Sequence, residues 1–246
     1  VGNSFTRETR NGITWTIEQP LEELAAGEGH NLEVTTLAHG SARLAYYAGL
    51  GDKKVSYYGE LLNLLTNHKW DYIIFQEQTT NAITSLETEM IPAVQQLRKM
   101  VTALQPQAKM LLYMNAGYSN GVAVKVDGVS RLLTTPEMSL RLAAGFKEIE
   151  RRLGVEVVMV GMHSRRIETL YPWINLTQSD NKHPNYAGYF LAASCFYYKI
   201  YGKTANPWNA SLTHCNVPVA DLALLCALPK DYLMINRNIV SLRVGK

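Results

Sequence analysis

Two short stretches at opposite ends of the chain carry residue types that could together do chemistry. Asp180 stands three residues ahead of His183, and Pro184 follows the histidine. A carboxylate in that position can accept a hydrogen bond from one imidazole nitrogen and leave the other free to take a proton. At the other end, Ser4 lies in a polar Gly-Asn-Ser stretch that could present its hydroxyl as a nucleophile. The pattern predicts that Ser4, His183 and Asp180 come together for acyl transfer.

Four motifs along the chain resemble, in the same order, those of the SGNH (GDSL-type) hydrolase family. In this sequence they read Gly2-Asn3-Ser4, Gly40, Phe75-Gln76-Glu77-Gln78 and Asp180-x-x-His183-Pro184. The resemblance spans almost the whole chain. It implies that Ser4 is the catalytic nucleophile, that His183 is the general base and that Asp180 orients the imidazole.

The resemblance also implies an oxyanion hole built from the backbone N–H groups of Ser4 and Gly40 and the side-chain amide of Gln76. The third motif lacks the Gly-x-Asn-Asp that the family usually has there. Gln76 is similar to the glutamine of the carbohydrate-acetylesterase branch, and Gln78 and Asn81 are the alternatives for the same role. A longer amide at the end of a strand can donate to an oxyanion as an asparagine does.

These motifs predict a serine esterase that hydrolyses short-chain esters, with acetyl as the acyl group and a carbohydrate as the alcohol. No cofactor is implied. Tyr118 and Trp173 lie on predicted loops among small and polar residues, where flat aromatic rings would suit a sugar. Trp173 could equally pack its loop under His183. A pocket crowded by Phe5 and Phe75 would favour acetate over a long acyl chain.

Two other functions remain open at this point. The same fold could serve as a glycan-binding module that does not cleave its ligand, although all three residue types of a triad are present. A lipid esterase or lysophospholipase would need a continuous apolar trough, and no long apolar loop is visible in the sequence.

The overall composition narrows the classes of protein and partner. Among the 246 residues, 47% are apolar and 18% are charged, which is typical of a globular protein with a sizeable core. A net charge of +3 without a dense Lys/Arg cluster disfavours a nucleic-acid partner. The apolar stretches are too short to cross a membrane. The expected partner is a small-molecule or glycan ester, and the sequence does not determine the oligomeric state.

The cysteines and histidines do not have the spacing of metal ligands. Cys195, Cys215 and Cys226 form no CxxC pair, and no His/Asp/Glu grouping suits a metal, so no metal is expected. Cys195 falls in an apolar helical stretch and is predicted to be buried, whereas Cys215 and Cys226 could pair. The compartment is open, with a secreted or periplasmic location favoured.

Hydrophobic periodicity predicts alternating helices and strands. Strands are expected at residues 32–38, 71–76, 109–114 and 155–160, and helices at 13–26, 61–69, 90–104, 136–153 and 186–201. Residues 115–135 are expected to form a long connection. The alternation predicts an α/β fold with a central parallel sheet between two helical layers. With the resemblance, this becomes a three-layer, flavodoxin-like SGNH-hydrolase domain spanning residues 1–246.

Two features of the N-terminal motif depart from the family. Asn3 stands where the family has an aspartate. The first strand of the family should precede the nucleophile, yet only Val1 precedes Gly2 in this numbering. Either that strand lies upstream, or another segment such as residues 240–244 replaces it.

Overall fold

Three parallel strands form the centre of the molecule. The computed structural model describes residues 1–51, 55–126, 128–213 and 215–231. Strands β3 (Tyr72–Gln76), β4 (Lys109–Tyr113) and β7 (Glu156–Val158) lie side by side in that order, with all neighbours parallel. Their continuous apolar runs suit a sheet that is covered on both faces. The predicted α/β fold with a central parallel sheet is confirmed.

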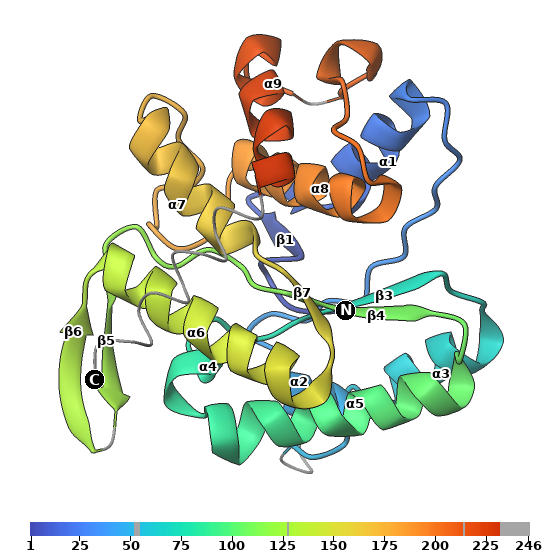
Figure 1. Cartoon of the computed structure of the whole chain (residues 1–246), viewed down its shortest axis with the longest axis vertical. Helices are drawn as coiled ribbons and strands as arrows, with labels where there is room; N and C mark the ends of the chain where they lie inside the picture. The colour runs from blue at the N-terminus through green and yellow to red at the C-terminus, as the bar shows by residue number, and fades with distance from the viewer. Residues whose placement is uncertain (52–54, 127, 214, 232–246) are drawn as a thin grey trace.

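Helices cover both faces of this sheet (Figure 1). One layer contains α2 (Leu44–Tyr47), α3 (Tyr58–Asn67), α4 (Asn81–Thr84), α5 (Ile91–Leu104) and α6 (Thr135–Leu153), with a π-helical turn η1 (Leu86–Met90) leading into α5. The other contains α1 (Glu18–Gly27), α7 (Val160–Leu170), α8 (Tyr186–Tyr201) and α9 (Val219–Ala227), with the 3₁₀ turns η2 (Pro207–Asn209) and η3 (Leu228–Asp231).

Alternate side chains of the strands divide the core into two halves. Phe75, Leu112 and Val157 point to the layer of α5 and α6, where they are buried. Leu111 and Val158 point the other way, into the layer of α8. The period of two along each strand therefore supplies apolar surface to both helical layers. Each fully buried side chain of this size contributes roughly 1.5–3 kcal/mol to folding.

Capping residues define where the longer helices begin and end. Thr134 and Glu137 form a capping box at the start of α6, and Gly154 ends that helix with a φ of 62°. The Asn185 side chain accepts a hydrogen bond from Gly188 N at the start of α8. The predicted helix boundaries at residues 136–153 and 186–201 agree with these elements.

The start of the chain lies along the free edge of β3. The Val1 ammonium donates to Ile74 O at 2.8 Å, and Gln76 N donates to Val1 O at 2.9 Å. On its other side, Gly2 N donates to Leu37 O at 2.9 Å. The chain therefore leaves the sheet at the end where β3 finishes, which is where open α/β sheets hold their ligands.

Three sequence-based assignments of secondary structure are wrong. Residues 13–16 form strand β2 (Ile13–Thr16), which pairs with β1 (Arg7–Arg10) and does not belong to a helix. Residues 32–38 form no strand but only one isolated bridge, between Ala38 and Gly2, because among the described residues only the backbone of Gly2 pairs with this segment. The connection 115–135 contains the antiparallel hairpin of β5 (Val122–Val126) and β6 (Val129–Leu133). Residues 240–244 lie outside the described residues.

The loop before α8 packs very closely on that helix. A Cβ atom on Gly188 would lie 2.4 Å from Leu176 O and 2.7 Å from Pro184 Cβ. Asn185 N donates to Leu176 O at 3.0 Å, and an isolated bridge joins Thr177 to Pro184. The absence of a side chain at Gly188 therefore lets the segment around Pro184 lie flat on the first turn of α8.

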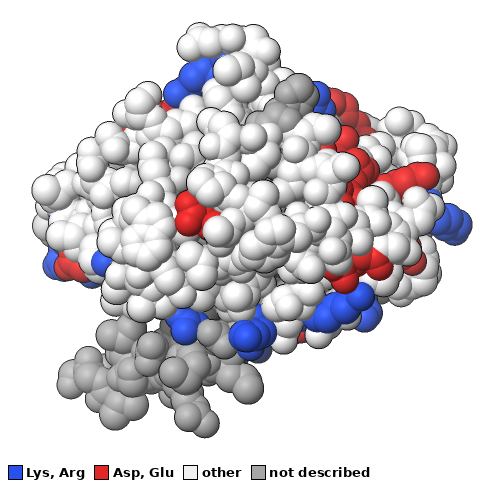
Figure 2. All heavy atoms as spheres, turned by 90° about the horizontal axis from the view of Figure 1, so that it is seen from above, with Lys and Arg blue, Asp and Glu red and all other residues white. Residues whose placement is uncertain are grey.

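Some general properties of the described part of the chain bear on its function. Among the described residues, no helix has both the length and the apolar character that crossing a bilayer requires. Cys195, Cys215 and Cys226 are all free thiols, and Cys195 is buried as predicted. On the face shown in Figure 2, the surface is mostly uncharged, and Lys and Arg side chains lie in separate small groups.

Candidate active site

Ser4, His183 and Asp180 lie in hydrogen-bonding contact although 179 residues separate the first two. Ser4 Oγ is 3.0 Å from His183 Nε2, and His183 Nδ1 is 2.7 Å from Asp180 Oδ2. All three residues are partly exposed to solvent. The serine hydroxyl can donate to Nε2 when Nδ1 carries the proton that is given to the carboxylate. This is the linear order that a nucleophile, a base and an orienting acid require.

Asp180 accepts hydrogen bonds at both of its oxygens. Oδ1 accepts from the backbone N–H groups of Lys182 and His183, each at 3.0 Å, and so fixes the turn that carries the imidazole. Oδ2 accepts from the imidazole and from Arg10 Nη1 at 2.9 Å. Partial burial alone would raise the pKa of Asp180, but the hydrogen bonds from His183, Lys182 and Arg10 outweigh it and hold that pKa well below its usual range. The carboxylate therefore stays ionised.

Asn3 organises the turn that presents Ser4. Its backbone O accepts from Thr6 N at 2.8 Å, and its side-chain Oδ1 accepts from Phe5 N at 3.1 Å. Its Nδ2 donates to Ala42 O at 3.0 Å. An ionised aspartate could not make this last bond because it has no donor. The structure thus gives a physical reason for the amide at this position.

Two buried tyrosines hold the carbonyl groups on either side of Asn3. Tyr47 Oη donates to Gly2 O at 2.6 Å, and Tyr189 Oη donates to Ser4 O. The first comes from α2 and the second from α8, so each helical layer contributes one bond. These contacts leave little freedom to the backbone around the Ser4 hydroxyl.

The proposed oxyanion donors differ in how their hydrogen-bonding groups are used. Gln76 is buried, its Oε1 accepts from Asn3 N at 2.9 Å, and its Nε2 donates to Glu77 O. This use of both ends of the side chain does not favour Gln76 as a donor to an oxyanion. Within the described residues, the N–H groups of Ser4 and Gly40 make no hydrogen bond to the protein.

Gln78 is better placed than Gln76 to offer a free amide. Its Oε1 accepts from Thr80 N at 3.0 Å and from Thr80 Oγ1 at 2.9 Å, which fixes the side chain. Its Nε2 has no protein partner among the described residues, and the residue is only half-buried. Asn81, the other alternative, is buried at the first position of α4.

Glu77 connects two segments that carry these donors, and sequence reasoning missed it. Its Oε1 accepts from Leu44 N at 3.2 Å and from Gln78 N at 2.6 Å. Leu44 begins the short helix α2, four residues after Gly40. The side chain is 1% exposed, and burial raises the pKa of Glu77 to about 7.

The two aromatic residues expected at the substrate site lie in different places. The Phe5 ring lies 5.5 Å from the His183 ring and 6.4 Å from the Tyr118 ring, so Tyr118 is part of the wall beside His183. Lys182 Nζ lies 5.6 Å from the centre of the Tyr118 ring. Trp173 is 64% exposed, and its Nε1 donates to Asp221 on α9 at 3.2 Å. The structure therefore brings Tyr118, but not Trp173, into the cluster around His183.

The β1–β2 hairpin adds Glu8 and Arg10, which sequence reasoning also missed. Arg10 Nη2 contacts Glu8 Oε1 at 3.0 Å, and Glu8 Oε1 lies 3.9 Å from His183 Nδ1. The signal that could have found them is Asn11-Gly12, a dipeptide that typically closes a two-residue hairpin. Both turn residues have positive φ, at 52° and 76°.

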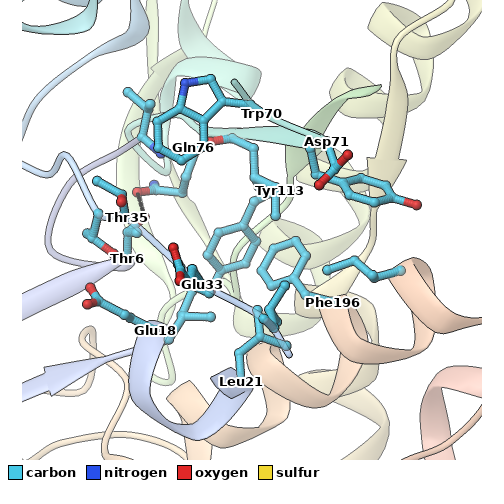
Figure 3. A pocket seen from close by; sticks show the side chains of 18 of the residues that line it. Thr6, Glu18, Leu21, Glu33, Thr35, Trp70, Asp71, Gln76, Tyr113 and Phe196 are labelled. Carbon is cyan, nitrogen blue, oxygen red and sulfur yellow. Dashed lines mark hydrogen bonds between the residues drawn. The ribbon is translucent and has the colours of Figure 1, made fainter. Parts of the chain in front are cut away.

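One cavity of the described structure adjoins Thr6 and Gln76. It has a volume of about 320 Å³ and lies between residues 31–36 and residues 69–72. Figure 3 shows the apolar side chains Leu21, Tyr113 and Phe196 that line it, and the bond from Thr6 to Gln76 on the left. Ser4, Asp180 and His183 do not line it. Each of these three residues is partly exposed to solvent. No group of three or more His, Cys, Asp or Glu side chains in the described ranges is arranged to hold a metal ion.

Comparison with solved structures places this fold among esterases and related hydrolases. A proposed SGNH hydrolase from Slackia heliotrinireducens is 25% identical, with a TM-score of 0.59 over 81% of this chain and 95% of that chain. A DUF4886 family protein from Bacteroides uniformis is 16% identical, with a TM-score of 0.67 over 94% and 92%. The carbohydrate acetylesterase Est24 from Sinorhizobium meliloti is 15% identical, with a TM-score of 0.54 over 82% and 96%. No protein-family model and no curated protein matches the sequence.

Replacing Glu77 by glutamine should remove a pH dependence of stability. The unfolded chain ionises Glu77 near its ordinary pKa of 4.5, whereas the folded protein holds the proton until about pH 7. The free energy of unfolding of the wild type therefore falls as the pH rises from about 4.5 to 7, and this loss is complete above the folded pKa. Glu77→Gln keeps an oxygen acceptor and has no such proton. Its stability relative to the wild type should rise across this window by at most about 3 kcal/mol.

Urea unfolding at pH 4, 5.5 and 7.5 measures this difference. Glu33→Gln is the matched control, because Glu33 is exposed, and it should follow the wild type at every pH. If Glu77→Gln and the wild type changed in parallel over the whole range, the buried carboxyl would not carry the proton that its environment indicates.

Proposed function

We propose that this chain, which belongs to the SGNH/GDSL superfamily by its fold, is a serine esterase. The observation that carries the proposal is the pair of contacts at His183. Its Nε2 lies 3.0 Å from Ser4 Oγ, and its Nδ1 lies 2.7 Å from Asp180 Oδ2. One imidazole thus has a hydroxyl to deprotonate and a carboxylate to stabilise the charge that results.

In the first half of the reaction, Ser4 Oγ attacks the carbonyl carbon of the ester. His183 Nε2 takes the hydroxyl proton as the Oγ–C bond forms, and the carbonyl oxygen becomes an oxyanion. When the intermediate collapses, the bond from carbon to the alcohol oxygen breaks, and His183 Nε2 gives its proton to the leaving alcohol. The acyl group stays on Ser4 as an ester. Asp180 remains ionised and stabilises the imidazolium at each stage.

In the second half, water replaces the alcohol. His183 Nε2 takes a proton from the water as its oxygen attacks the acyl carbon. The bond from that carbon to Ser4 Oγ then breaks, and the serine oxygen regains its proton from the imidazolium. The products are a carboxylic acid and the free enzyme, so that no cofactor is consumed.

The oxyanion in both halves would accept from the backbone N–H groups of Ser4 and Gly40 and from the Nε2 of Gln78. Each of these donors lacks a protein partner among the described residues. We assign Gln76 instead to holding the nucleophile turn, because its Oε1 accepts from Asn3 N. Donors that are already fixed before the charge develops need no reorganisation during the reaction.

The substrate is proposed to be a short-chain ester, most simply an acetyl ester of a carbohydrate. Phe5 and Tyr118 form an aromatic wall beside His183, which leaves little room for a long acyl chain. A half-buried aromatic ring with a nearby ammonium group, as in Tyr118 and Lys182, suits the faces and hydroxyl groups of a sugar. A carbohydrate acetylesterase is among the proteins of similar fold.

Replacing Ser4 by alanine should abolish hydrolysis of an activated acetate ester. We expect kcat/KM to fall by a factor of about 10⁴ or more, because the nucleophile is lost. A fluorophosphonate probe, which reacts only with an activated serine, should label the wild type and should not label Ser4→Ala. Ser130→Ala changes an exposed serine of β6 and should behave as the wild type in both assays. A folded wild type that fails to react with the probe would favour a glycan-binding module.

Alanine at Gln78 and at Gln76 should have different effects. Gln78→Ala should lower kcat by about 10²–10³-fold, as the loss of one oxyanion donor typically does, with a smaller loss of stability than Gln76→Ala because the Thr80 donors are only partly buried. Gln76→Ala should lower the free energy of unfolding, because the buried N–H of Asn3 loses its acceptor. Exposed Gln95→Ala is the control for both measurements. Normal kcat in Gln78→Ala, together with a stable but slow Gln76→Ala, would return the oxyanion role to Gln76.

Catalytic efficiency should fall as the acyl chain of the substrate lengthens. We expect kcat/KM to decrease on the order of 100-fold from acetate to octanoate, since extra methylene groups would have to displace the aromatic wall. Tyr118→Ala should reduce this difference by opening the wall, whereas the exposed Trp208→Ala should not. A profile that is flat or rises with chain length would favour a lipid substrate.

A further inference from the structure

Two charged side chains of the β1–β2 hairpin face His183 from the side opposite Ser4. Along β1, Glu8 and Arg10 are half-buried, while Arg7 and Thr9 are exposed, because alternate residues of a strand face opposite sides. The Glu8 side chain is only 11% exposed, and that of Arg10 is 38% exposed. The inner face of the hairpin thus places one carboxylate and one guanidinium group beside the imidazole.

Arg10 and His183 share a single oxygen of Asp180. Arg10 Nη1 lies 2.9 Å from Asp180 Oδ2, the atom that also accepts the Nδ1–H of His183 at 2.7 Å. The guanidinium and the imidazole therefore share the negative charge of this oxygen, and the carboxylate stabilises an imidazolium less than it would without Arg10. The guanidinium also adds to the hydrogen bonds from His183 and Lys182 that favour the ionised form of this carboxylate.

Arg10 also lies close to the imidazole itself. Its Nη2 is 3.4 Å from His183 Nδ1. Both nitrogens carry hydrogen when Nδ1 donates to Asp180, so this contact is not a hydrogen bond. A positive charge at this distance raises the free energy of the imidazolium relative to the neutral ring.

The hairpin is built to keep Arg10 in this place. Glu8 Oε1 accepts from Arg10 Nη2 at 3.0 Å, and Glu8 Oε2 accepts from Gln178 Nε2 at 2.7 Å. The same Nε2 donates to Pro184 O at 2.8 Å, and Gln178 N donates to His183 O at 2.8 Å. The acid that holds Arg10 is therefore tied to the loop that carries the histidine.

We propose that Arg10 is a positioning residue that holds Asp180 in alignment and resists protonation of His183 in the resting enzyme. Glu8 anchors Arg10 in this role. This inference rests on the proposed function, because an imidazole must be neutral to act as a base. In its effect, Arg10 extends the activity of the triad to lower pH.

The sign of the effect depends on all the charges around His183. Among the described residues, Glu8 and Arg10 approach it from β1, Asp180 approaches it from its own loop, and Ser4 contacts the other ring nitrogen. Lys182 lies over the Tyr118 ring. Removing Arg10 leaves the carboxylates of Glu8 and Asp180 near Nδ1 without the cation that they share. The imidazolium form of His183 then becomes more favourable relative to the neutral ring.

The test compares Arg10→Met, which has a neutral side chain of similar length, with the wild type. We expect the acid limb of kcat/KM for an activated acetate ester to move to higher pH by roughly half a unit to one unit. The pH midpoint of the His183 ring resonance, assigned by its loss in His183→Gln, should move in the same direction. Arg10→Lys keeps the positive charge, so its acid limb and resonance midpoint should lie close to those of the wild type. Arg7→Met, on the outer face of the same strand, should also follow the wild type.

An acid limb and a resonance midpoint that both coincide with those of the wild type would overturn the proposal. It would also be overturned if activity fell equally at all pH values, since that would indicate a purely structural hairpin. The resonance does not depend on turnover. An inactive wild type whose His183 midpoint still responds to Arg10 would refute the esterase and support the assigned role of Arg10.

Discussion

The hydrogen bond from Asn3 N to the buried Oε1 of Gln76 is the contact on which the arrangement of the site depends. It joins the turn that carries Ser4 to the end of β3, across 73 residues of sequence. Val1 continues the same connection through two backbone bonds to β3. With the turn fixed there, Ser4 Oγ faces the loop before α8, and His183 can reach it. An unsatisfied N–H at this buried position would cost about 1–3 kcal/mol, so the turn has little freedom to move away.

The two sides of the candidate site are stabilised by different means. The nucleophile turn is held by buried, mostly neutral hydrogen bonds from both helical layers, including those of Tyr47 and Tyr189. The histidine loop is held by charged groups near the surface, with Asp180 at the centre. Charged contacts at partly exposed positions respond to pH and salt far more than buried neutral ones do. The candidate base, His183, is therefore the part of the site whose protonation its charged neighbours can influence most.

The sequence indicated those features that depend on local patterns. The apolar runs of β3 and β4, the cap and terminal glycine of α6 and the Asp-x-x-His-Pro motif before α8 each carry their signal within a few residues. Residues 32–38 have the composition of a strand, yet a strand also needs a partner, and among the described residues only the backbone of Gly2 pairs with this segment. The contacts of Glu8, Arg10 and Glu77 could not be predicted, because they depend on which faces of distant segments meet. The Asn11-Gly12 dipeptide favours the hairpin, but the apolar residues after it have helical spacing, and this spacing favours a helix instead.

The single carboxylate oxygen of Glu77 that accepts from both Leu44 N and Gln78 N has a consequence for how the site tolerates change. The segment after Gly40 and the segment of Gln78 cannot shift independently, because Leu44 N and Gln78 N both donate to the same oxygen. Substitutions in these two segments should therefore be energetically coupled, and their combined effect should differ from the sum of the separate effects. In evolutionary terms, the two segments are expected to vary together, with neither tolerating a change that the other does not accommodate.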